Sequence, residues 1–290
     1  MDNSTTSPLI AGTMKWGDWG AKMTQHQLSR YIEHCLSLGI RTFDCAAIYG
    51  GYTTEAEFGA AMADVGVERS GFRTISKCGI EYLCAQNPID LKHYDYTFDS
   101  ILSSVDRSLQ RLQVDSLDVL LLHRPSPLMD PEVVASAVDV LKKNGKIQSF
   151  GVSNFSTSTL SLLGKHVAID THQIQCSLTH LGPFTDGTLD YHMQNRMVTQ
   201  CWNPLGTMFS EIGEREERII ATAKALTQKY GVGLNTLCIA WLLKHPARLS
   251  PVVGTTNEVH LSEMADAVHL EMEQIDWFRL YTASTGVDVP

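Results

Sequence analysis

Eight short apolar segments recur along the chain, and a stretch with the hydrophobic spacing of a helix follows each of them. Short apolar runs followed by helical periodicity are typical of β-strands that alternate with helices. We therefore predict eight strands, which begin at Leu9, Arg41, Phe72, Leu117, Ile147, Val167, Val198 and Ser250.

The spacing also predicts where individual helices begin and end. Residues 24–38 place apolar side chains such as Tyr31 and Cys35 on one helical face. Thr54 and Glu57 have the spacing of a capping box, in which each side chain bonds the backbone of the other. We expect that box at the start of the second helix.

Strands that alternate with helices predict a parallel sheet, and eight such units fit a closed (β/α)8 barrel, the TIM barrel. An open, doubly wound sheet is the alternative, but no G-x-G-x-x-G motif follows the first strand. The predicted fold class is thus α/β, with residues 1–290 as one (β/α)8 barrel domain. Helices over residues 258–267 and 273–282 form a C-terminal helical extension.

Composition narrows the functional classes. The 290 residues carry a formal net charge of −9, which argues against a nucleic-acid footprint of clustered Lys and Arg. No run of about 18 apolar residues is present, so no membrane span is expected. We predict a monomer or weak oligomer that acts on a small molecule.

Seven cysteines are scattered without a CxxC pair, which is typical of reduced thiols in a cytoplasmic protein. Residues 1–8 are polar and lack the basic start and apolar core of a secretory signal. Both observations predict a cytoplasmic location. A metal-dependent barrel hydrolase is disfavoured because His123 and His172 stand on different strands without H-x-H spacing.

Four polar residues follow three neighbouring strands of the predicted barrel. Asp44 ends the second strand, Tyr49 follows it, Lys77 ends the third and His123 ends the fourth. The carboxyl ends of barrel strands meet at one mouth, where active sites of TIM barrels lie. We therefore expect these four side chains to meet there.

Their chemical types suit the reduction of a carbonyl group. A free phenol has a pKa of about 10, and a neighbouring cation lowers it. Lys77 can be that cation for Tyr49, with Asp44 holding the ammonium group, and His123 can hydrogen-bond a carbonyl oxygen. Because no side chain donates a hydride, the reaction needs a cofactor.

The sequence resembles the aldo-keto reductase family over nearly its whole length. The matching stretches are GTMKWG at 12–17, FD at 43–44 with YG at 49–50, SK at 76–77, LLHRP at 121–125, GKI at 145–147 with GVSNF at 151–155, HQI at 172–174, NPLG at 203–206 and VVGTT at 252–256. This resemblance implies a (β/α)8 barrel that binds NADPH in an extended form at the carboxyl ends of its strands. It also implies that Asp44, Tyr49, Lys77 and His123 are the catalytic tetrad, with Tyr49 as the general acid.

The resemblance implies cofactor contacts as well. Ser153, Asn154 and Gln173 match the positions that hold the nicotinamide carboxamide, and Trp202 matches an aromatic residue that stacks on the ring. The other matching positions are Gly12, Thr13 and Met14, then Asn203, Pro204, Leu205 and Gly206 over the pyrophosphate, Gly254, Thr255, Thr256, Asn257 and His260 near the 2′-phosphate, and Glu263 at the adenine.

One departure affects cofactor choice. The family often has a Lys at the Gly254 position and an Arg at the His260 position, and neutral His cannot make the bidentate phosphate contacts of Arg. We expect NADP(H) from the resemblance, and NAD(H) stays open.

Aromatic side chains are expected to line the substrate pocket, which suits small aldehydes and ketones. Trp16, Tyr49 and His123 are the expected substrate contacts, with Trp19, Tyr82, residues 184–193 and the tail past Tyr281 around the mouth. The predicted function is an NAD(P)H-dependent oxidoreductase that reduces aldehydes or ketones to alcohols. The alternative is a nicotinamide-binding regulatory or accessory subunit with little turnover.

Overall fold

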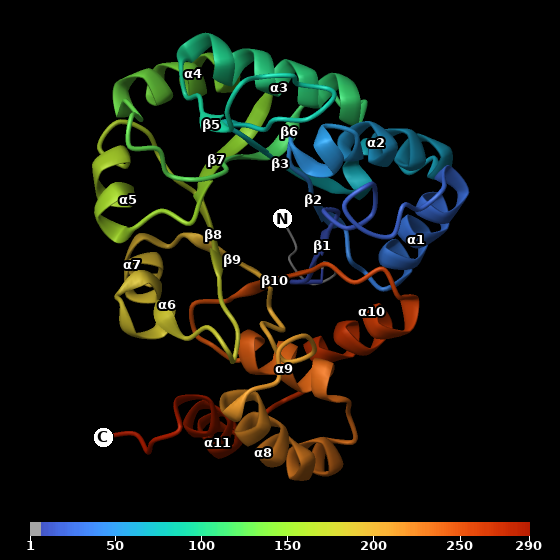
Figure 1. The fold of residues 1–290 in the computed structure, drawn as a ribbon, viewed down its shortest axis with the longest axis vertical. Helices are drawn as coiled ribbons and strands as arrows, with labels where there is room; N and C mark the ends of the chain where they lie inside the picture. The colour runs from blue at the N-terminus through green and yellow to red at the C-terminus, as the bar shows by residue number, and fades with distance from the viewer. Residues whose placement is uncertain (1–6) are drawn as a thin grey trace.

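Eight parallel strands close into a barrel, with helices around it (Figure 1). The computed structural model describes residues 7–290. Around the barrel the strand order is β1-β10-β9-β8-β7-β6-β3-β2. These strands are β1 (Ile10–Gly12), β2 (Thr42–Asp44), β3 (Arg73–Cys78), β6 (Leu117–Leu122), β7 (Ile147–Ser153), β8 (Thr171–Gln175), β9 (Val198–Trp202) and β10 (Ser250–Val253). The predicted (β/α)8 barrel is confirmed, and the open sheet is excluded.

The helices follow the strands in the predicted order. They are α1 (Gln25–Ser37), α2 (Thr54–Val65), α3 (Phe98–Leu112), α4 (Pro131–Lys143), α5 (Thr157–Leu163), α6 (Gly182–Thr185), α7 (Thr188–Asn195), α8 (Glu214–Tyr230), α9 (Leu234–Leu243), α10 (Glu258–Ala265) and α11 (Gln274–Thr285). Short 3₁₀ turns lie at Tyr49–Gly51, Arg69–Gly71 and Asp266–His269. The C-terminal helix α11 packs against α8, at the bottom of Figure 1.

Helix α1 begins as its sequence indicates. Thr24 is the N-cap and forms a capping box with Gln27, and apolar residues such as Tyr31 face the barrel. The capping box predicted for Thr54 and Glu57 was wrong. Thr53 is the N-cap and Thr54 is already the first residue of α2, no side chain caps the helix, and the Thr54 hydroxyl has no hydrogen-bond partner among the described residues.

Two further elements differ from the predictions. The strand predicted to begin at Val167 begins only at Thr171. The segment 181–194, predicted as a long loop that can hold one helix, contains the two short helices α6 and α7. After β3 the chain also forms an antiparallel hairpin of β4 (Ile80–Glu81) and β5 (His93–Tyr94). Strands of two residues leave too little periodicity to be detected in a sequence.

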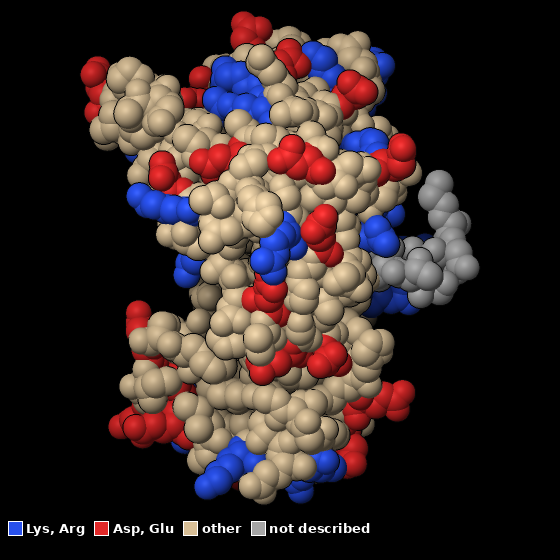
Figure 2. All heavy atoms as spheres, turned by 90° about the vertical axis from the view of Figure 1, so that its right-hand side faces the viewer, with Lys and Arg blue, Asp and Glu red and all other residues tan. Residues whose placement is uncertain are grey.

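Several compositional predictions concern the molecule as a whole. No helix within residues 7–290 is long and apolar enough to cross a membrane, and no three potential metal ligands gather there. All seven cysteines are free thiols. Acidic and basic side chains are interspersed on the face shown in Figure 2. The prediction that residues 1–8 are no secretory signal falls mostly on residues 1–6, outside the described residues.

Candidate functional site

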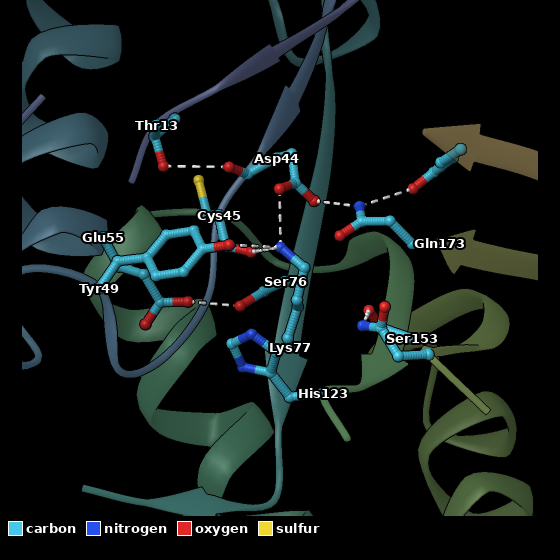
Figure 3. Close-up of polar contacts among 12 residues, drawn as sticks. Thr13, Asp44, Cys45, Tyr49, Glu55, Ser76, Lys77, His123, Ser153 and Gln173 are labelled. Carbon is cyan, nitrogen blue, oxygen red and sulfur yellow. Dashed lines mark hydrogen bonds and ion pairs between the residues drawn. The ribbon is translucent and has the colours of Figure 1, made fainter. Parts of the chain in front are cut away.

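The amine of Lys77 is the centre of a buried polar cluster at the carboxyl ends of β2 and β3 (Figure 3). Its Nζ atom lies 2.7 Å from Oδ2 of Asp44 and 3.0 Å from the hydroxyl of Tyr49, and it donates to the carbonyl of Cys45 at 2.9 Å. All three donor hydrogens of the ammonium group are therefore used. Residues that are 28 to 33 positions apart meet because β2 and β3 pair in parallel register.

The charges in this cluster keep Lys77 protonated. Burial works to lower the pKa of Lys77, but Asp44 and Tyr49 outweigh burial and hold that pKa above its ordinary value. The pKa of Tyr49 differs from the expectation that Lys77 would lower it. Burial raises the pKa of Tyr49 above its ordinary value, although the charge of Lys77 and its hydrogen bond act to lower it. Tyr49 is therefore a neutral phenol beside a cation at neutral pH.

His123 lies beside Tyr49. Its ring centre is 6.0 Å from that of Tyr49 in an edge-on arrangement, and its side chain is buried. Burial lowers the pKa of His123 well below its ordinary value, and the nearby cations Lys77, Arg124 and Lys92 lower it further. A neutral imidazole can donate one hydrogen bond to a ligand without bringing a charge.

A buried carboxylate supports β3 from the helix side. Glu55 at the start of α2 accepts a hydrogen bond from Ser76 at 2.6 Å (Figure 3) and another from Ser108 at 3.2 Å. Burial raises the pKa of Glu55. Because Ser76 precedes Lys77 on β3, these bonds fix the strand segment from which the amine projects.

Gln173 on β8 links this cluster to the opposite side of the barrel. Its Nε2 atom donates to Oδ1 of Asp44 at 2.8 Å and to Oε1 of Gln200 at 3.0 Å. Both hydrogens of the amide are therefore used, which leaves its oxygen as the atom for a ligand to approach. Gln200 on β9 was missed by sequence reasoning because no motif singles it out.

Ser153, Asn154 and Trp202 form a second polar group, on β7 and β9. Asn154 has a φ of 60°, and its side chain donates to Ser153 at 2.7 Å and accepts from the indole nitrogen of Trp202 at 2.8 Å. Arg124 donates to the Ser153 hydroxyl at 3.4 Å and lies 5.7 Å from the centre of the Trp202 ring. The structure thus brings the residues matched to nicotinamide binding together, through hydrogen bonds to one another.

A cavity of about 640 Å³ opens above these groups at the mouth of the barrel. Twelve residues predicted for the site line it: Gly12, Met14, Asp44, Tyr49, His123, Gln173, Trp202, Asn203, Pro204, Leu205, Gly254 and Thr255. Trp19 and Tyr82, predicted at the mouth, line it as well. Further lining residues that sequence reasoning missed include Lys15, Lys92, Tyr94, Arg124 and Met264. Arg124 lies inside the matched LLHRP stretch, which is the signal that could have found it.

Other predicted site residues do not line this cavity. Thr13 donates to the carbonyl of Asp44 at 3.1 Å, and Asn257 caps helix α10 through the amide of Val259 at 2.9 Å. Glu263 accepts from the amide of Asn235 at 2.6 Å. The remaining residues of this group are Lys77, Ser153, Asn154, Gly206, Thr256 and His260.

Gly206 has a conformation that its neighbours require. Its φ is 56°, and a Cβ atom there would come within 1.9 Å of the hydroxyl oxygen of Thr179. Only glycine fits, because both the backbone angle and the space exclude a side chain. This fixes the path of the chain directly after the lining residues Asn203, Pro204 and Leu205.

The structure corrects the placement of Trp16, which was expected to contact the substrate. Its side chain is 1% exposed and packs in the core against Tyr31, Phe43 and Phe58. Trp19, three residues later, is 37% exposed and its ring centre lies 6.1 Å from that of Tyr49. The turn after β1 thus directs Trp16 inward and Trp19 towards the cavity.

Two segments expected around the mouth also do not line the cavity. Phe184 packs against Trp241 and His245, and Tyr281 stacks on Trp277. Phe184 therefore packs at α9 (Trp241) and the residues after it, and Tyr281 packs within α11. The presence of aromatic residues in these two segments did not indicate whether they pack against helices or line the mouth.

A phenol, an ammonium group and a neutral imidazole at the carboxyl ends of TIM-barrel strands form an acid–base site. The model of the Aldo/keto reductase family matches residues 8–282 of this chain. The chain therefore belongs to the aldo/keto reductase family, and it is an oxidoreductase of that family. Members generally use nicotinamide cofactors and act on small carbonyl compounds.

Similar proteins are known in several bacteria. The chain is 37% identical to the uncharacterized oxidoreductase YcsN of Bacillus subtilis, over 98% of this chain and 96% of the relative. It is 36% identical to the 6-dehydroglucose reductase of Agrobacterium fabrum, over 99% of this chain and 97% of that relative. Among solved structures, a glycerol dehydrogenase from Gluconobacter oxydans matches with a TM-score of 0.87 at 20% identity, over 100% of this chain and 95% of that one. The last likeness shows the shared fold.

Proposed function

We propose that this protein is an NAD(P)H-dependent reductase that converts aldehydes or ketones to alcohols. The observation that carries the proposal is the contact of the Lys77 amine with both Asp44 and the Tyr49 hydroxyl, at the wall of a cavity. That arrangement supplies a proton donor whose conjugate base is stabilised by a cation.

The residues at the β7 to β10 side of the cavity suit a nicotinamide cofactor. Gln173 offers an amide oxygen, and Trp202 offers an indole face. Gly254 lines the cavity, with no atom within 4 Å of the position of a Cβ, so a ligand can approach the backbone there. When bound, the cofactor supplies the hydride.

In the proposed reaction, the Tyr49 hydroxyl donates its proton to the carbonyl oxygen of the substrate. Lys77 stabilises the phenolate that remains, and Asp44 holds the ammonium group in place. His123, neutral because burial lowers its pKa, donates a hydrogen bond to the same oxygen and orients the carbonyl. Tyr49 and His123 are thus the proposed substrate contacts.

NADP(H) is the cofactor that we favour, from the family, with NAD(H) as the other option. The positions that often hold Lys and Arg near the 2′-phosphate are Gly254 and His260 here, so no permanent cation stands at either. We also keep a cytoplasmic location and a monomeric or weakly associated state as predictions.

The test is to mix the purified protein with NADPH or NADH and follow the loss of absorbance against a panel of aldehydes and ketones. The panel includes neutral aromatic aldehydes and the 6-aldehyde of glucose, since one relative is named a 6-dehydroglucose reductase. We expect turnover with at least one aldehyde and a higher kcat/KM with NADPH. Binding of the cofactor without turnover of any compound would instead support the regulatory or accessory subunit.

The pH dependence of reduction follows from the two shifted groups. Because the pKa of Tyr49 is raised, the phenol stays protonated at neutral pH and loses its proton only when the pH rises beyond about 10. Because the pKa of His123 is lowered, that ring stays neutral as the pH falls through about 6.5. We expect kcat/KM for reduction to be flat between about pH 6 and 9 and to fall at higher pH. A break near pH 6.5, or a rate that rises with pH, would contradict this assignment.

A further inference from the structure

The hairpin after β3 forms one wall of the cavity and carries polar and aromatic side chains. Tyr82, Lys92 and Tyr94 all line the cavity from this segment. Trp19 completes the wall, with its ring centre 5.3 Å from that of Tyr82. Lys92 is the one cation among the residues of the hairpin that line the cavity.

The charge of the cavity is opposite to that of the protein. The chain has a net charge of −9, yet the charged lining residues are Lys15, Lys92 and Arg124 together with the single carboxylate of Asp44. Asp44 is already paired with Lys77. Charges farther away than about 10 Å are largely screened by salt, so a ligand in the cavity experiences mainly the nearby cations.

The three cations are not equivalent. Arg124 is committed to the carbonyl of His123 at 3.1 Å and to Ser153, on the side of Trp202. Lys15 follows β1, which lies between β2 and β10 and so adjoins the proposed cofactor side as well. Lys92 follows β3, which lies across the barrel from β8 and β9.

Lys92 has no carboxylate partner within residues 7–290. Its ammonium group lies 5.8 Å from the centre of the Tyr82 ring. It also stands close enough to His123 to contribute to the lowered pKa of that ring. A cation without a carboxylate partner among residues 7–290 therefore lines the cavity from the hairpin wall, near His123.

We propose that Lys92 selects carbonyl substrates that carry a carboxylate, by pairing with that group while the carbonyl lies at Tyr49 and His123. This inference rests on the proposed function and names its substrate class. A lone ammonium group acts as a point charge and suits a monoanion, whereas tighter phosphate sites gather several donors. The aromatic wall of Trp19, Tyr82 and Tyr94 would contact the apolar part of such a substrate.

The test compares 4-carboxybenzaldehyde with its neutral methyl ester, using whichever of NADPH and NADH supports turnover. We expect the wild-type protein to show a lower KM for the carboxylate. Lys92→Met should lower kcat/KM for the carboxylate about fivefold, mainly through KM, because an exposed ion pair contributes modestly. The ester should be unaffected, Lys92→Arg should retain the preference, and 0.5 M salt should weaken it.

The matched control is Lys165→Met, which removes an exposed lysine that precedes β8, at the opposite end of the barrel. This variant should leave kcat/KM unchanged for both the carboxylate and the ester. The inference is overturned if the wild-type protein has the same KM for the acid and the ester, or if Lys92→Met lowers kcat/KM equally for both compounds. Absence of turnover with any carbonyl compound would refute the proposed function and this inference together, and turnover without a carboxylate preference would refute the inference alone.

Discussion

Tyr49→Phe is expected to lower kcat for carbonyl reduction by about 10²- to 10⁴-fold, because it removes the proton donor from an otherwise intact site. The hydroxyl that is lost donates no hydrogen bond to Gln173 or Trp202, so the cofactor should bind with nearly unchanged affinity. Steady-state kinetics measure kcat, and fluorescence titration with NADPH measures the affinity for the cofactor.

Tyr94→Phe is the matched control for this experiment. Tyr94 also lines the cavity, but its hydroxyl has no contact with Lys77. It should retain most of the activity. An unchanged kcat in Tyr49→Phe, with the fold intact by circular dichroism, would refute the assignment of Tyr49 as the general acid.

Lys77→Met is expected to abolish most activity and also to destabilise the protein by about 3–5 kcal/mol, since it leaves the buried carboxylate of Asp44 without its cation. The two side chains are only 1% and 4% exposed, so water cannot replace the lost partner. Urea unfolding measures the free energy, and the reductase assay measures the activity.

The double variant Asp44→Asn/Lys77→Met separates the two effects. Removing both charges should restore much of the lost stability, because no unpaired charge remains, while activity stays low. As a surface control, Lys143→Met breaks an exposed pair with Asp139 and should cost less than about 1 kcal/mol. A Lys77→Met protein as stable as the wild type would show that Asp44 does not depend on this pairing.

The predicted bounds of two strands, 117–122 for β6 and 198–202 for β9, agree with the structure at both ends. In β6, five of the six residues are apolar, as expected for a strand that is buried on both faces. Strand β9 also buries two polar residues, Thr199 and Gln200. The start of β8 and the hairpin β4–β5 were not found. Val167, Ala168 and Ile169 are apolar but lie outside β8, and two-residue strands carry no period.

The candidate site was predictable in part from the order of residues along the chain. Asp44, Lys77 and His123 come at or just after strand ends, and parallel strands in a barrel bring their carboxyl ends to one mouth. A linear pattern therefore fixes which side chains can meet. It could not identify the roles of Gln200 or Lys92, which depend on neighbours far along the chain.

The sequence by itself determined the alternation of strands and helices, the closed barrel and the meeting of Asp44, Tyr49, Lys77 and His123 at its mouth, since these depend on local periodicity and chain order. Tertiary structure alone decided that Trp16 is buried while Trp19 faces the cavity. It also decided that burial outweighs Lys77 in setting the pKa of Tyr49. Burial and the electrostatic field at an atom are sums over neighbours from many strands, and no local stretch of sequence contains them.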